Sequence, residues 1–153
     1  MQPLKNIFSL GTGKRGWDGF TGLLKRHGIE MVIDVRSFPV SRFPHFKKDF
    51  LVAKLAEEGF GYLHLGKELG GYRREGYEAY TQTLSYLAGM ELLERMASRC
   101  LSVFICAETL PWRCHRRFIA RSLAERGWKV THLIDEKRVW EDDVSEDAGS
   151  EEP

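Results

Sequence analysis

Short apolar runs alternate along the chain with segments whose apolar residues recur every three or four positions. Runs of five or six mostly apolar residues have the length and composition of strands that are buried on both faces of a sheet. Apolar residues at i, i+3, i+4 and i+7 are typical of helices that pack one face on a core. The expected strands are residues 6–10, 31–35, 60–65, 101–106 and 128–133, and the expected helices are residues 20–27, 49–58, 77–97 (with a break near Thr83 or Gly89) and 112–126.

This alternation predicts an α/β fold, a single three-layer domain with a mainly parallel sheet of about five strands and helices on both faces. The chain has 153 residues, which suits one such domain. We expect the domain to span residues 1–140. Residues 141–153 hold seven acids and no Lys or Arg, so we expect an acidic disordered tail there.

The charge of the chain is unevenly distributed. The first 140 residues carry 23 Lys and Arg against 15 acids, a net charge of +8. A basic body suggests an anionic partner, either a small ligand or a nucleic acid. The alternative is an ordinary solvated surface with a solubilising tail.

Polar residues and glycines cluster directly after the expected strands. Asp34 and Arg36 follow the second strand, residues 70–73 follow the third, and Cys106 and Glu108 end the fourth. The carboxyl ends of parallel strands gather at one edge of a sheet, and ligands bind there. We therefore expect these loops to line one pocket. The ligand-binding residues expected in the first two loops are Arg36, Gly70, Gly71, Tyr72 and Arg73.

The segment between the fourth strand and the last helix carries the most candidate chemistry. Pro111 is typical of a first helical turn, so we expect the helix to begin near Trp112. With that start, His115 and Arg116 flank the apolar stripe of the helix and Cys114 points away from it. We therefore favour His115 and Arg116 over Cys114 as site residues.

Four side chains are candidates for catalysis. Cys106 could act as a nucleophile if a helix N-terminus and arginines lowered its pKa, but burial and Glu108 favour a raised pKa and an unreactive core cysteine. Asp34 and Glu108 could each act as a general base or hold a substrate, or they could be pinned by arginines that fix the loops. The remaining catalytic candidate is His115. The ligand-binding residues expected beside them are Trp112, Arg113 and Arg116.

Residues 37–48 mix basic and aromatic side chains, and we expect Arg42 and His45 to contact the ligand. Such a loop could be a lid over a small ligand, a surface for single-stranded nucleic acid, or a loop packed down by its own aromatics; we favour the lid. The spacing Cys-x7-Cys-His matches no standard zinc pattern, so we expect no metal. No motif identifies a cofactor.

The remaining features concern the compartment. No apolar run approaches the roughly 18 residues of a membrane span. The N-terminus lacks the pattern of a signal peptide. The three cysteines have no framework spacing. We therefore expect a reducing, cytoplasmic setting and no membrane partner.

Several motifs in combination resemble the domain of unknown function 488 family over nearly the whole expected domain. The motifs are Asp34-Val-Arg36, Ser41-Arg42 with Pro44-His-Phe46, Leu69-Gly-Gly71, Cys106-Ala-Glu108, Pro111-Trp112 and Cys114-His-Arg116. The resemblance implies an α/β fold and a shared pocket, and it names no reaction. One element differs, because family members usually carry a Gly-His-Ser-like element after the first strand, where this chain has Gly11-Thr-Gly13.

A looser likeness concerns layout alone. Asp-Val-Arg after a strand, followed later by a strand-Cys-loop-helix unit, is similar to the arrangement of rhodanese sulfurtransferases. Their cysteine lies in a loop of backbone amides that cradles an anion. Glu108 and Pro111 are unsuited to such a loop, because a carboxylate repels anions and proline has no N–H to donate.

The leading interpretation is an enzyme that acts on a small phosphorylated or nucleotide-like molecule. Arginines after the strands would hold its anionic groups, and Cys106, Glu108 and Asp34 would lie nearest the chemistry. One alternative is a nucleic-acid-binding module that uses the basic aromatic loops. Another is a regulatory domain that binds a ligand without turnover.

Overall fold

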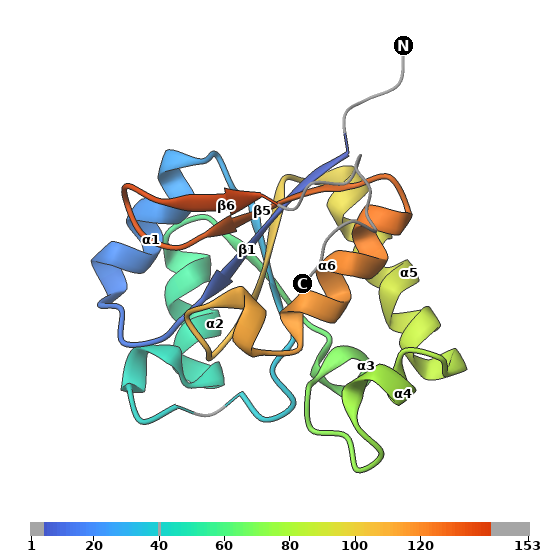
Figure 1. Ribbon diagram of the computed structural model, residues 1–153. Coiled ribbons are helices and arrows are strands. Elements are labelled where there is room, and N and C mark those ends of the chain that lie inside the picture. Colours follow the sequence, from blue (N-terminus) through green and yellow to red (C-terminus); the bar gives the residue numbers. More distant parts are fainter. Residues whose placement is uncertain (1–4, 40, 142–153) are drawn as a thin grey trace.

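The computed structural model describes residues 5–39 and 41–141, which form a single sheet covered by helices (Figure 1). The strands are β1 (Asn6–Gly11), β2 (Met31–Asp34), β3 (Gly61–His64), β4 (Ser102–Cys106), β5 (Lys129–Leu133) and β6 (Val139–Glu141). They lie in the order β3-β2-β4-β1-β5-β6. All neighbours are parallel except β5 and β6, which are antiparallel. The α/β prediction is confirmed. The pattern of apolar residues did not indicate β6, which lies at the sheet edge beyond β5.

Helices cover both faces of the sheet, as the alternating pattern predicted (Figure 1). The two faces can be followed along β4, whose alternate side chains enter different cores. Val103 joins the core that contains Phe20, whereas Phe104 and Cys106 join the core that contains Leu123. The helices are α1 (Trp17–Arg26), α2 (Lys48–Glu57), α3 (Gly66–Leu69), α4 (Tyr77–Tyr80), α5 (Leu84–Arg99) and α6 (Arg116–Glu125), with the 3-10 helices η1 (Pro44–Phe46) and η2 (Pro111–Arg113).

The long helix expected over residues 77–97 is broken near Thr83, as predicted. Thr83 Oγ1 accepts a hydrogen bond from the backbone N–H of Tyr86 at 3.2 Å, so this threonine caps α5. A difference lies just before α4. The segment after β3, where the sequence pattern indicated no helix, begins with the short helix α3.

The expected start of the last helix is wrong. The 3-10 helix η2 ends at Arg113, and Cys114 takes an extended conformation with φ −143° and ψ −179°. A new helix, α6, then begins at Arg116, with His115 at its N-cap. The extended residue turns Cys114, His115 and Arg116 away from the positions that one continuous helix would give them, which changes the side chains that reach the sheet edge.

The loop after β4 is held against the loop after β1. Gly11 lies beside Cys106 in the parallel register, and Thr12 donates its backbone N–H to Cys106 O at 2.8 Å. A Cβ atom on Gly11 would lie only 1.8 Å from the backbone oxygen of Glu108. Only glycine allows this approach. The element Gly11-Thr-Gly13 therefore supports the loop after β4.

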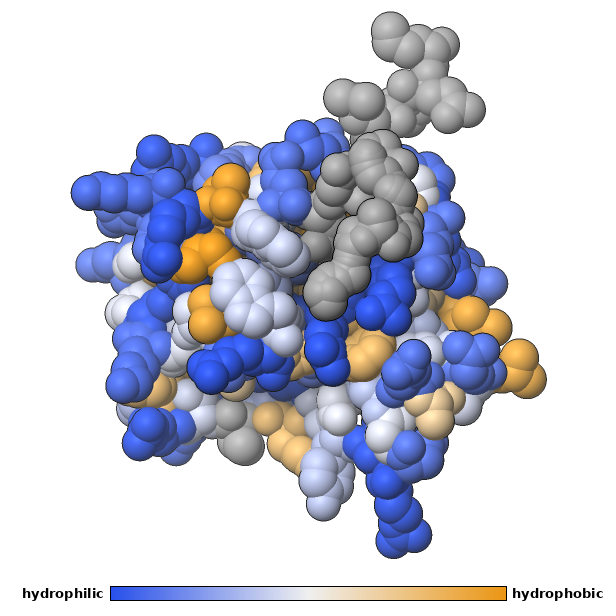
Figure 2. Space-filling view, in the orientation of Figure 1, coloured by the Kyte–Doolittle hydropathy of each residue, from blue (hydrophilic) through white to orange (hydrophobic). Residues whose placement is uncertain are grey.

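The face shown in Figure 2 is largely hydrophilic, with small separate hydrophobic patches. Among the described residues, no helix is long and apolar enough to cross a membrane. The acidic tail was expected from residue 141 onward. Glu141 is the last residue of β6, and residues 142–153 lie outside the described part of the chain.

Candidate active site

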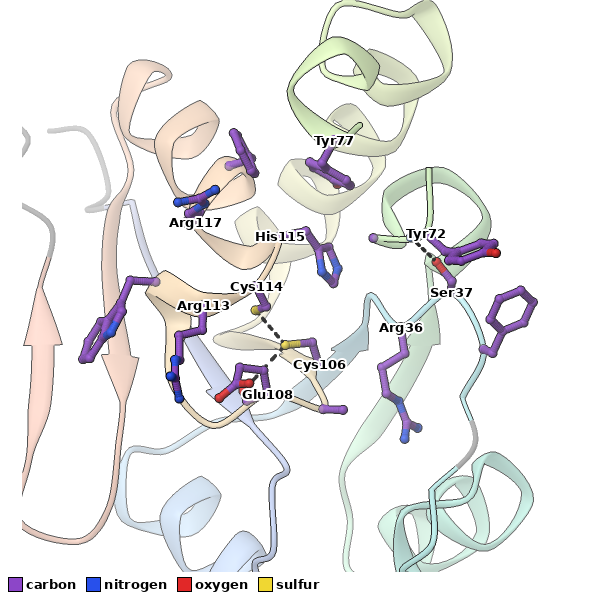
Figure 3. A pocket seen from close by; sticks show the side chains of 15 residues that line it. Arg36, Ser37, Tyr72, Tyr77, Cys106, Glu108, Arg113, Cys114, His115 and Arg117 are labelled. Atoms are coloured by element: carbon purple, nitrogen blue, oxygen red, sulfur yellow. Dashed lines mark hydrogen bonds between the residues drawn. The ribbon is translucent and has the colours of Figure 1, made fainter. Parts of the chain in front are cut away.

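A cavity of about 580 Å³ opens at the carboxyl end of the sheet, where β2 and β4 lie side by side (Figure 3). Its wall combines the loops after these two strands, the glycine turn before α4, and the segment from η2 into α6. The lining residues are Arg36, Ser37, Phe38, Gly71, Tyr72, Tyr77, Cys106, Ala107, Glu108, Trp112, Arg113, Cys114, His115, Arg117 and Phe118.

The cavity brings together about half of the residues that the sequence pointed to. Those that line it are Arg36, Gly71, Tyr72, Cys106, Glu108, Trp112, Arg113 and His115. Those that do not line it are Asp34, Arg42, His45, Gly70, Arg73 and Arg116. The cavity is also lined by Cys114, which the expected helix disfavoured as a site residue, and by Arg117 and Tyr77, which the sequence pattern did not indicate.

Two cysteines meet at the floor of the cavity (Figure 3). The Sγ atoms of Cys106 and Cys114 are 3.0 Å apart, and both residues are free cysteines. Cys106, at the end of β4, is only 2% exposed. Cys114 is partly exposed, so it is the sulfur that a molecule in the cavity can reach.

Arg116 lies directly behind the two sulfurs. Its Nε–H is 3.0 Å from the Sγ of Cys106 and 3.3 Å from the Sγ of Cys114. The side chain is fully buried, and its other N–H groups donate to Ser9 Oγ at 2.9 Å and to backbone oxygens of the loop after β4. We expected Arg116 to hold a ligand. The structure instead places its guanidinium beneath the cavity floor, because α6 starts later than the sequence pattern indicated.

The positive charge of Arg116 favours a negative charge on the two sulfurs beside it. A buried guanidinium needs an anionic partner. Within residues 5–39 and 41–141, no carboxylate forms an ion pair with Arg116, and its side-chain partners are the two sulfurs and Ser9. The two sulfurs therefore lie where a thiolate would balance this charge.

The pKa values of the two thiols shift in opposite directions. Burial raises the pKa of Cys106 well above its usual value, and the hydrogen bond that it donates to Cys114 raises it further. The same hydrogen bond lowers the pKa of Cys114 despite burial, and His115 and Arg116 lower it further. The raised pKa predicted for Cys106 is confirmed, although burial rather than the Glu108 carboxylate is its main cause. Of the two thiols, Cys114 is the one whose surroundings favour ionisation.

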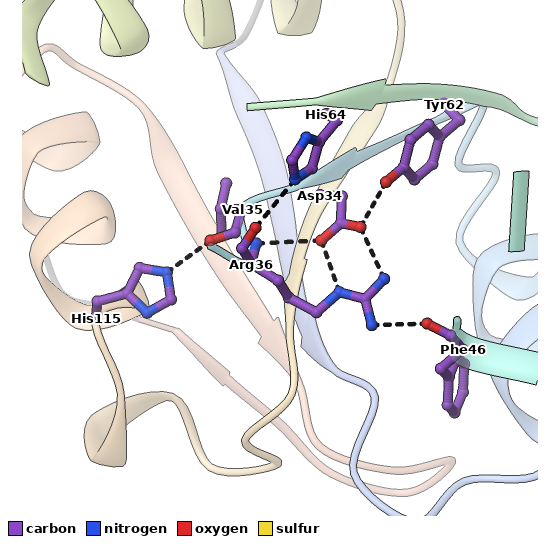
Figure 4. Close-up of polar contacts among 7 residues, drawn as sticks. All are labelled: Asp34, Val35, Arg36, Phe46, Tyr62, His64 and His115. Atoms are coloured by element: carbon purple, nitrogen blue, oxygen red, sulfur yellow. Dashed lines mark hydrogen bonds and ion pairs between the residues drawn. The ribbon is translucent and has the colours of Figure 1, made fainter. Parts of the chain in front are cut away.

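His115 is fixed in one orientation (Figure 4). Its Nε2 lies 2.9 Å from the backbone oxygen of Val35, and since a carbonyl only accepts, Nε2 carries the hydrogen. In the neutral ring, Nδ1 is then the lone-pair nitrogen. The ring packs on Tyr77 with centroids 5.2 Å apart, which holds it at the cavity wall.

Asp34 and Arg36 form a buried ion pair beside the cavity (Figure 4). Two guanidinium nitrogens of Arg36 donate to the two carboxylate oxygens of Asp34, each at 2.8 Å. The third donates to Phe46 O at 2.7 Å, and Tyr62 donates its hydroxyl to Asp34 at 2.6 Å. Burial and the Asp34 charge raise the pKa of Tyr62, so this hydroxyl keeps its proton. Asp34, which we expected to be catalytic, thus serves to tie the loop after β2 to strand β3 and helix η1.

The lid predicted over residues 37–48 is wrong for most of the segment. Phe46 is fully buried, and Phe43 packs on the same core. His45 does not line the cavity: its Nε2 donates to Arg15 O at 2.8 Å, and its ring contacts Phe46. Arg42 stacks on the ring of Phe43. The loop is packed down by its own aromatics, and Phe38 is the part of it that reaches the cavity together with Ser37.

The glycine turn shapes the opposite wall. A Cβ atom on Gly70 would lie 2.1 Å from Ser37 Oγ, so this glycine allows the turn to approach the loop after β2. Ser37 Oγ also accepts the backbone N–H of Tyr72 at 3.0 Å. Arg73 donates to Gly70 O at 2.9 Å and stacks on Tyr80, so it braces the turn from outside the cavity.

The rim of the cavity is basic and aromatic. Arg113 and Arg117 lie on it, and Arg117 stacks on Phe118 with its guanidinium 4.7 Å from the ring centre. The exposed aromatics are Phe38 (65%), Tyr72 (81%) and Trp112 (46%). Arginines that recur every four residues, at 113, 117 and 121, were visible in the sequence and would have identified Arg117.

Glu108 supplies the one carboxylate of the lining. Its Oε2 accepts the backbone N–H of Leu110 at 3.2 Å, which stiffens the loop before η2. Among the described residues, no group of three or more His, Cys, Asp or Glu side chains is arranged to hold a metal ion.

Comparison with known proteins yields one match. The family model described as Domain of unknown function DUF488 matches residues 16–123, a span that includes both cysteines of the cavity floor. No curated protein and no solved structure is significantly similar to the chain.

Proposed function

We propose a function from the cavity itself, because the chain belongs to the family described as Domain of unknown function DUF488, and that description names no reaction. The protein is an enzyme in which the Cys114 thiolate attacks a small anionic molecule of the phosphorylated or nucleotide-like kind. The sequence had pointed to Cys106 for this role. The position of Cys114 on the cavity side of the pair favours Cys114 instead.

The observation that carries the proposal is the buried Arg116 in contact with both sulfurs. The backbone N–H of Arg116, in the first turn of α6, also points to Cys114 Sγ at 3.4 Å. A sulfur at a helix N-terminus beside a guanidinium is the environment in which cysteines are nucleophilic at neutral pH. A purely structural cysteine does not need this arrangement.

The rim favours an anionic substrate. Within the described chain, neither Arg113 nor Arg117 forms an ion pair with a carboxylate, so both guanidinium groups can meet substrate oxygens. Phe38, Tyr72 and Trp112 present exposed rings on which a planar group could stack. Charge and stacking together suit a nucleotide-like molecule better than an aliphatic one.

Two groups can handle protons during the reaction. His115 lines the cavity, with Nδ1 as the ring nitrogen that Val35 O does not hold, and Glu108 lines it from the loop after β4. Either can deliver a proton to a leaving group or take one from an attacking water. His115 also lowers the pKa of Cys114, so it acts on the nucleophile itself.

The test uses two alkylating reagents of the same size that differ in charge. Iodoacetate is anionic and iodoacetamide is neutral, and both modify thiolates. With Cys100 replaced by serine, we expect Cys114 to react with iodoacetate unusually fast relative to iodoacetamide. Arg113→Gln and Arg117→Gln should each lower this rate ratio several-fold, because each removes a charge from the rim.

Arg121→Gln is the matched control, since Arg121 lies one turn further along α6 and outside the cavity lining. Equal ratios in all variants, or slow alkylation of Cys114 by both reagents, would refute the proposal. Turnover of phosphate esters or nucleotides that is lost in Cys114→Ser separates an enzyme from a regulatory domain that binds without turnover.

A second candidate function is the binding of single-stranded nucleic acid. Arg117 and Arg121 both lie against Phe118 on α6, and Arg113 from η2 lines the cavity together with Arg117. Basic rows beside exposed aromatics are typical of single-strand binding surfaces. In a gel shift with a generic single-stranded oligonucleotide, Arg121→Gln should weaken binding and reduce its dependence on salt. This variant therefore separates the two candidates, because it leaves the alkylation ratio unchanged.

A further inference from the structure

The proposed nucleophile has a second sulfur directly behind it. Cys106 Sγ is 3.0 Å from Cys114 Sγ, and Cys106 is almost fully buried, so a substrate in the cavity reaches Cys114 first. We propose that the pair is a two-electron thiol–disulfide centre: Cys114 attacks a small anionic disulfide, and Cys106 then resolves the adduct by forming a disulfide with Cys114. This inference rests on the nucleophilic role of Cys114 in the proposed function, and it names the reaction.

The reaction consists of two successive thiol–disulfide exchanges. The Cys114 thiolate attacks one sulfur of the substrate RS–SR, the substrate S–S bond breaks, and RS⁻ leaves. Cys106 loses its proton and attacks Cys114 Sγ, the bond between Cys114 and the bound RS group breaks, and RSH leaves with a proton. Two electrons pass from the cysteines to the substrate, and a small thiol reductant returns the pair to its starting state.

The geometry needs little change for the second step. A disulfide bond is about 2.05 Å long, so the two sulfur atoms must close by roughly 1 Å. Cys114 lies in the extended link between η2 and α6, where its backbone N–H makes only a long hydrogen bond to Pro111 O at 3.5 Å and its carbonyl accepts the N–H of Arg117 at 3.2 Å. Cys106 lies almost fully buried beside Cys114 at the cavity floor, so the departing RS group can leave through the open cavity.

Arg116 provides a reason for the order of events. While Cys114 is ionised, its charge keeps the proton on Cys106, because two thiolates this close repel each other. Once Cys114 is bonded to the substrate sulfur, that charge is gone. The Nε–H of Arg116, 3.0 Å from Cys106 Sγ, then stabilises a Cys106 thiolate instead. The resolving thiol is therefore ionised only when an adduct is present to be resolved.

The side chains on the rim favour a disulfide that is anionic and aromatic. Arg113 and Arg117 favour an anionic disulfide over a cationic one, and the exposed rings of Phe38 and Tyr72 favour an aromatic one. Dithiobis(nitrobenzoate) is anionic and aromatic, and each thiolate that it releases is coloured. It therefore reports both steps. Cystamine is a cationic disulfide with a poorer leaving group, so each reagent's rate on the protein is divided by its rate with free cysteine before the two charges are compared.

The experiment counts released thiolate in the full chain carrying Cys100→Ser, which leaves Cys106 and Cys114. With dithiobis(nitrobenzoate) we expect two equivalents of thiolate per chain, no retained adduct, and a Cys106–Cys114 disulfide in the unreduced peptide map. Cys106→Ser should release one equivalent and keep the adduct on Cys114. After division by the rates with free cysteine, cystamine should still react at least about ten-fold more slowly than the anionic reagent.

The outcomes separate the two proposals. Release of one equivalent with a stable adduct on Cys114, in the chain that retains Cys106, would overturn the resolving role and leave the Cys114 nucleophile intact. Slow release with no modification of Cys114 would overturn both. The peptide map of the chain with Cys106 present needs no substitution in the core, so the test does not depend on the folding of Cys106→Ser.

Discussion

Gly71 and His115 are packed so closely that a methyl group on Gly71 would lie 2.6 Å from Nδ1 of the His115 ring. The glycine turn thus presses against the imidazole from one side while Val35 O holds Nε2 from the other. The ring is fixed between two segments that are far apart in sequence. Its orientation toward the cavity therefore depends on the loop after β2 and on the turn before α4 together.

Gly71→Ala should displace the His115 ring. We expect a loss of about 1 to 3 kcal/mol in the free energy of unfolding from overpacking, together with slower alkylation of Cys114. Urea unfolding and alkylation rates measure the two effects. Gly22→Ala is the control, because no atom lies within 4 Å of its Cβ position in α1, and it should stabilise the protein by about 0.5 to 1 kcal/mol. Unchanged alkylation in Gly71→Ala would contradict the proposed contact.

Asp34→Asn should strongly destabilise the fold, because we assign Asp34 a structural role and not a catalytic one. The substitution leaves the buried Arg36 guanidinium without its counter-charge, which costs about 3 to 5 kcal/mol for a buried pair. Denaturant unfolding measures this loss. Asp135→Asn breaks an exposed ion pair with Arg138 and should change stability little. If Asp34→Asn unfolded at the same denaturant concentration as the parent protein, the structural role given to Asp34 would be wrong.

Alkylation of Cys114 should depend weakly on pH. Thiolate is present above the pKa, so a lowered pKa keeps Cys114 ionised throughout the range from about pH 5 to pH 8. A cysteine with the free value of about 8.5 would instead slow by nearly three orders of magnitude over that range. Cys106→Ala removes the hydrogen bond that lowers the Cys114 pKa most, so its alkylation rate should fall at the acidic end. A steep profile in the parent protein would exclude a Cys114 thiolate.

Ser9 connects Arg116 to His132 on the neighbouring strand β5. Arg116 donates to Ser9 Oγ, and Ser9 Oγ is hydrogen-bonded to His132 Nδ1 at 2.5 Å, with all three residues buried. Ser9→Ala should cost about 1 to 3 kcal/mol, because it removes a partner from a buried guanidinium, and it should slow alkylation of Cys114. Ser98→Ala on the exposed face of α5 is the control and should have little effect on either measurement. A normal alkylation rate in Ser9→Ala would show that Ser9 does not help to position Arg116.

The local pattern of apolar residues was sufficient to predict the α/β architecture. The run of apolar residues that became β4 is buried at every position, and its neighbours on both sides are parallel strands. Strand and helix alternate, and parallel strands place the loops after them at one edge. Hence Arg36, Gly71 and Glu108, from three separate loops, could be assigned to one site before any contact was known.

The roles of single side chains at that site were decided by tertiary contacts. Asp34 and Arg36, two residues apart, neutralise each other, and periodicity says nothing about which partner a buried charge will find. Cys114 became the cavity thiolate because an extended residue interrupts the helix that its sequence neighbours favoured. For the same reason Arg116 lies buried beneath the cavity floor and not in the ligand-binding position that we expected. By itself the sequence determined where the strands end and which loops meet there, since hydrophobic periodicity is a local property. Only the folded chain decided which sulfur carries the charge, because that depends on burial and on a guanidinium brought from another element.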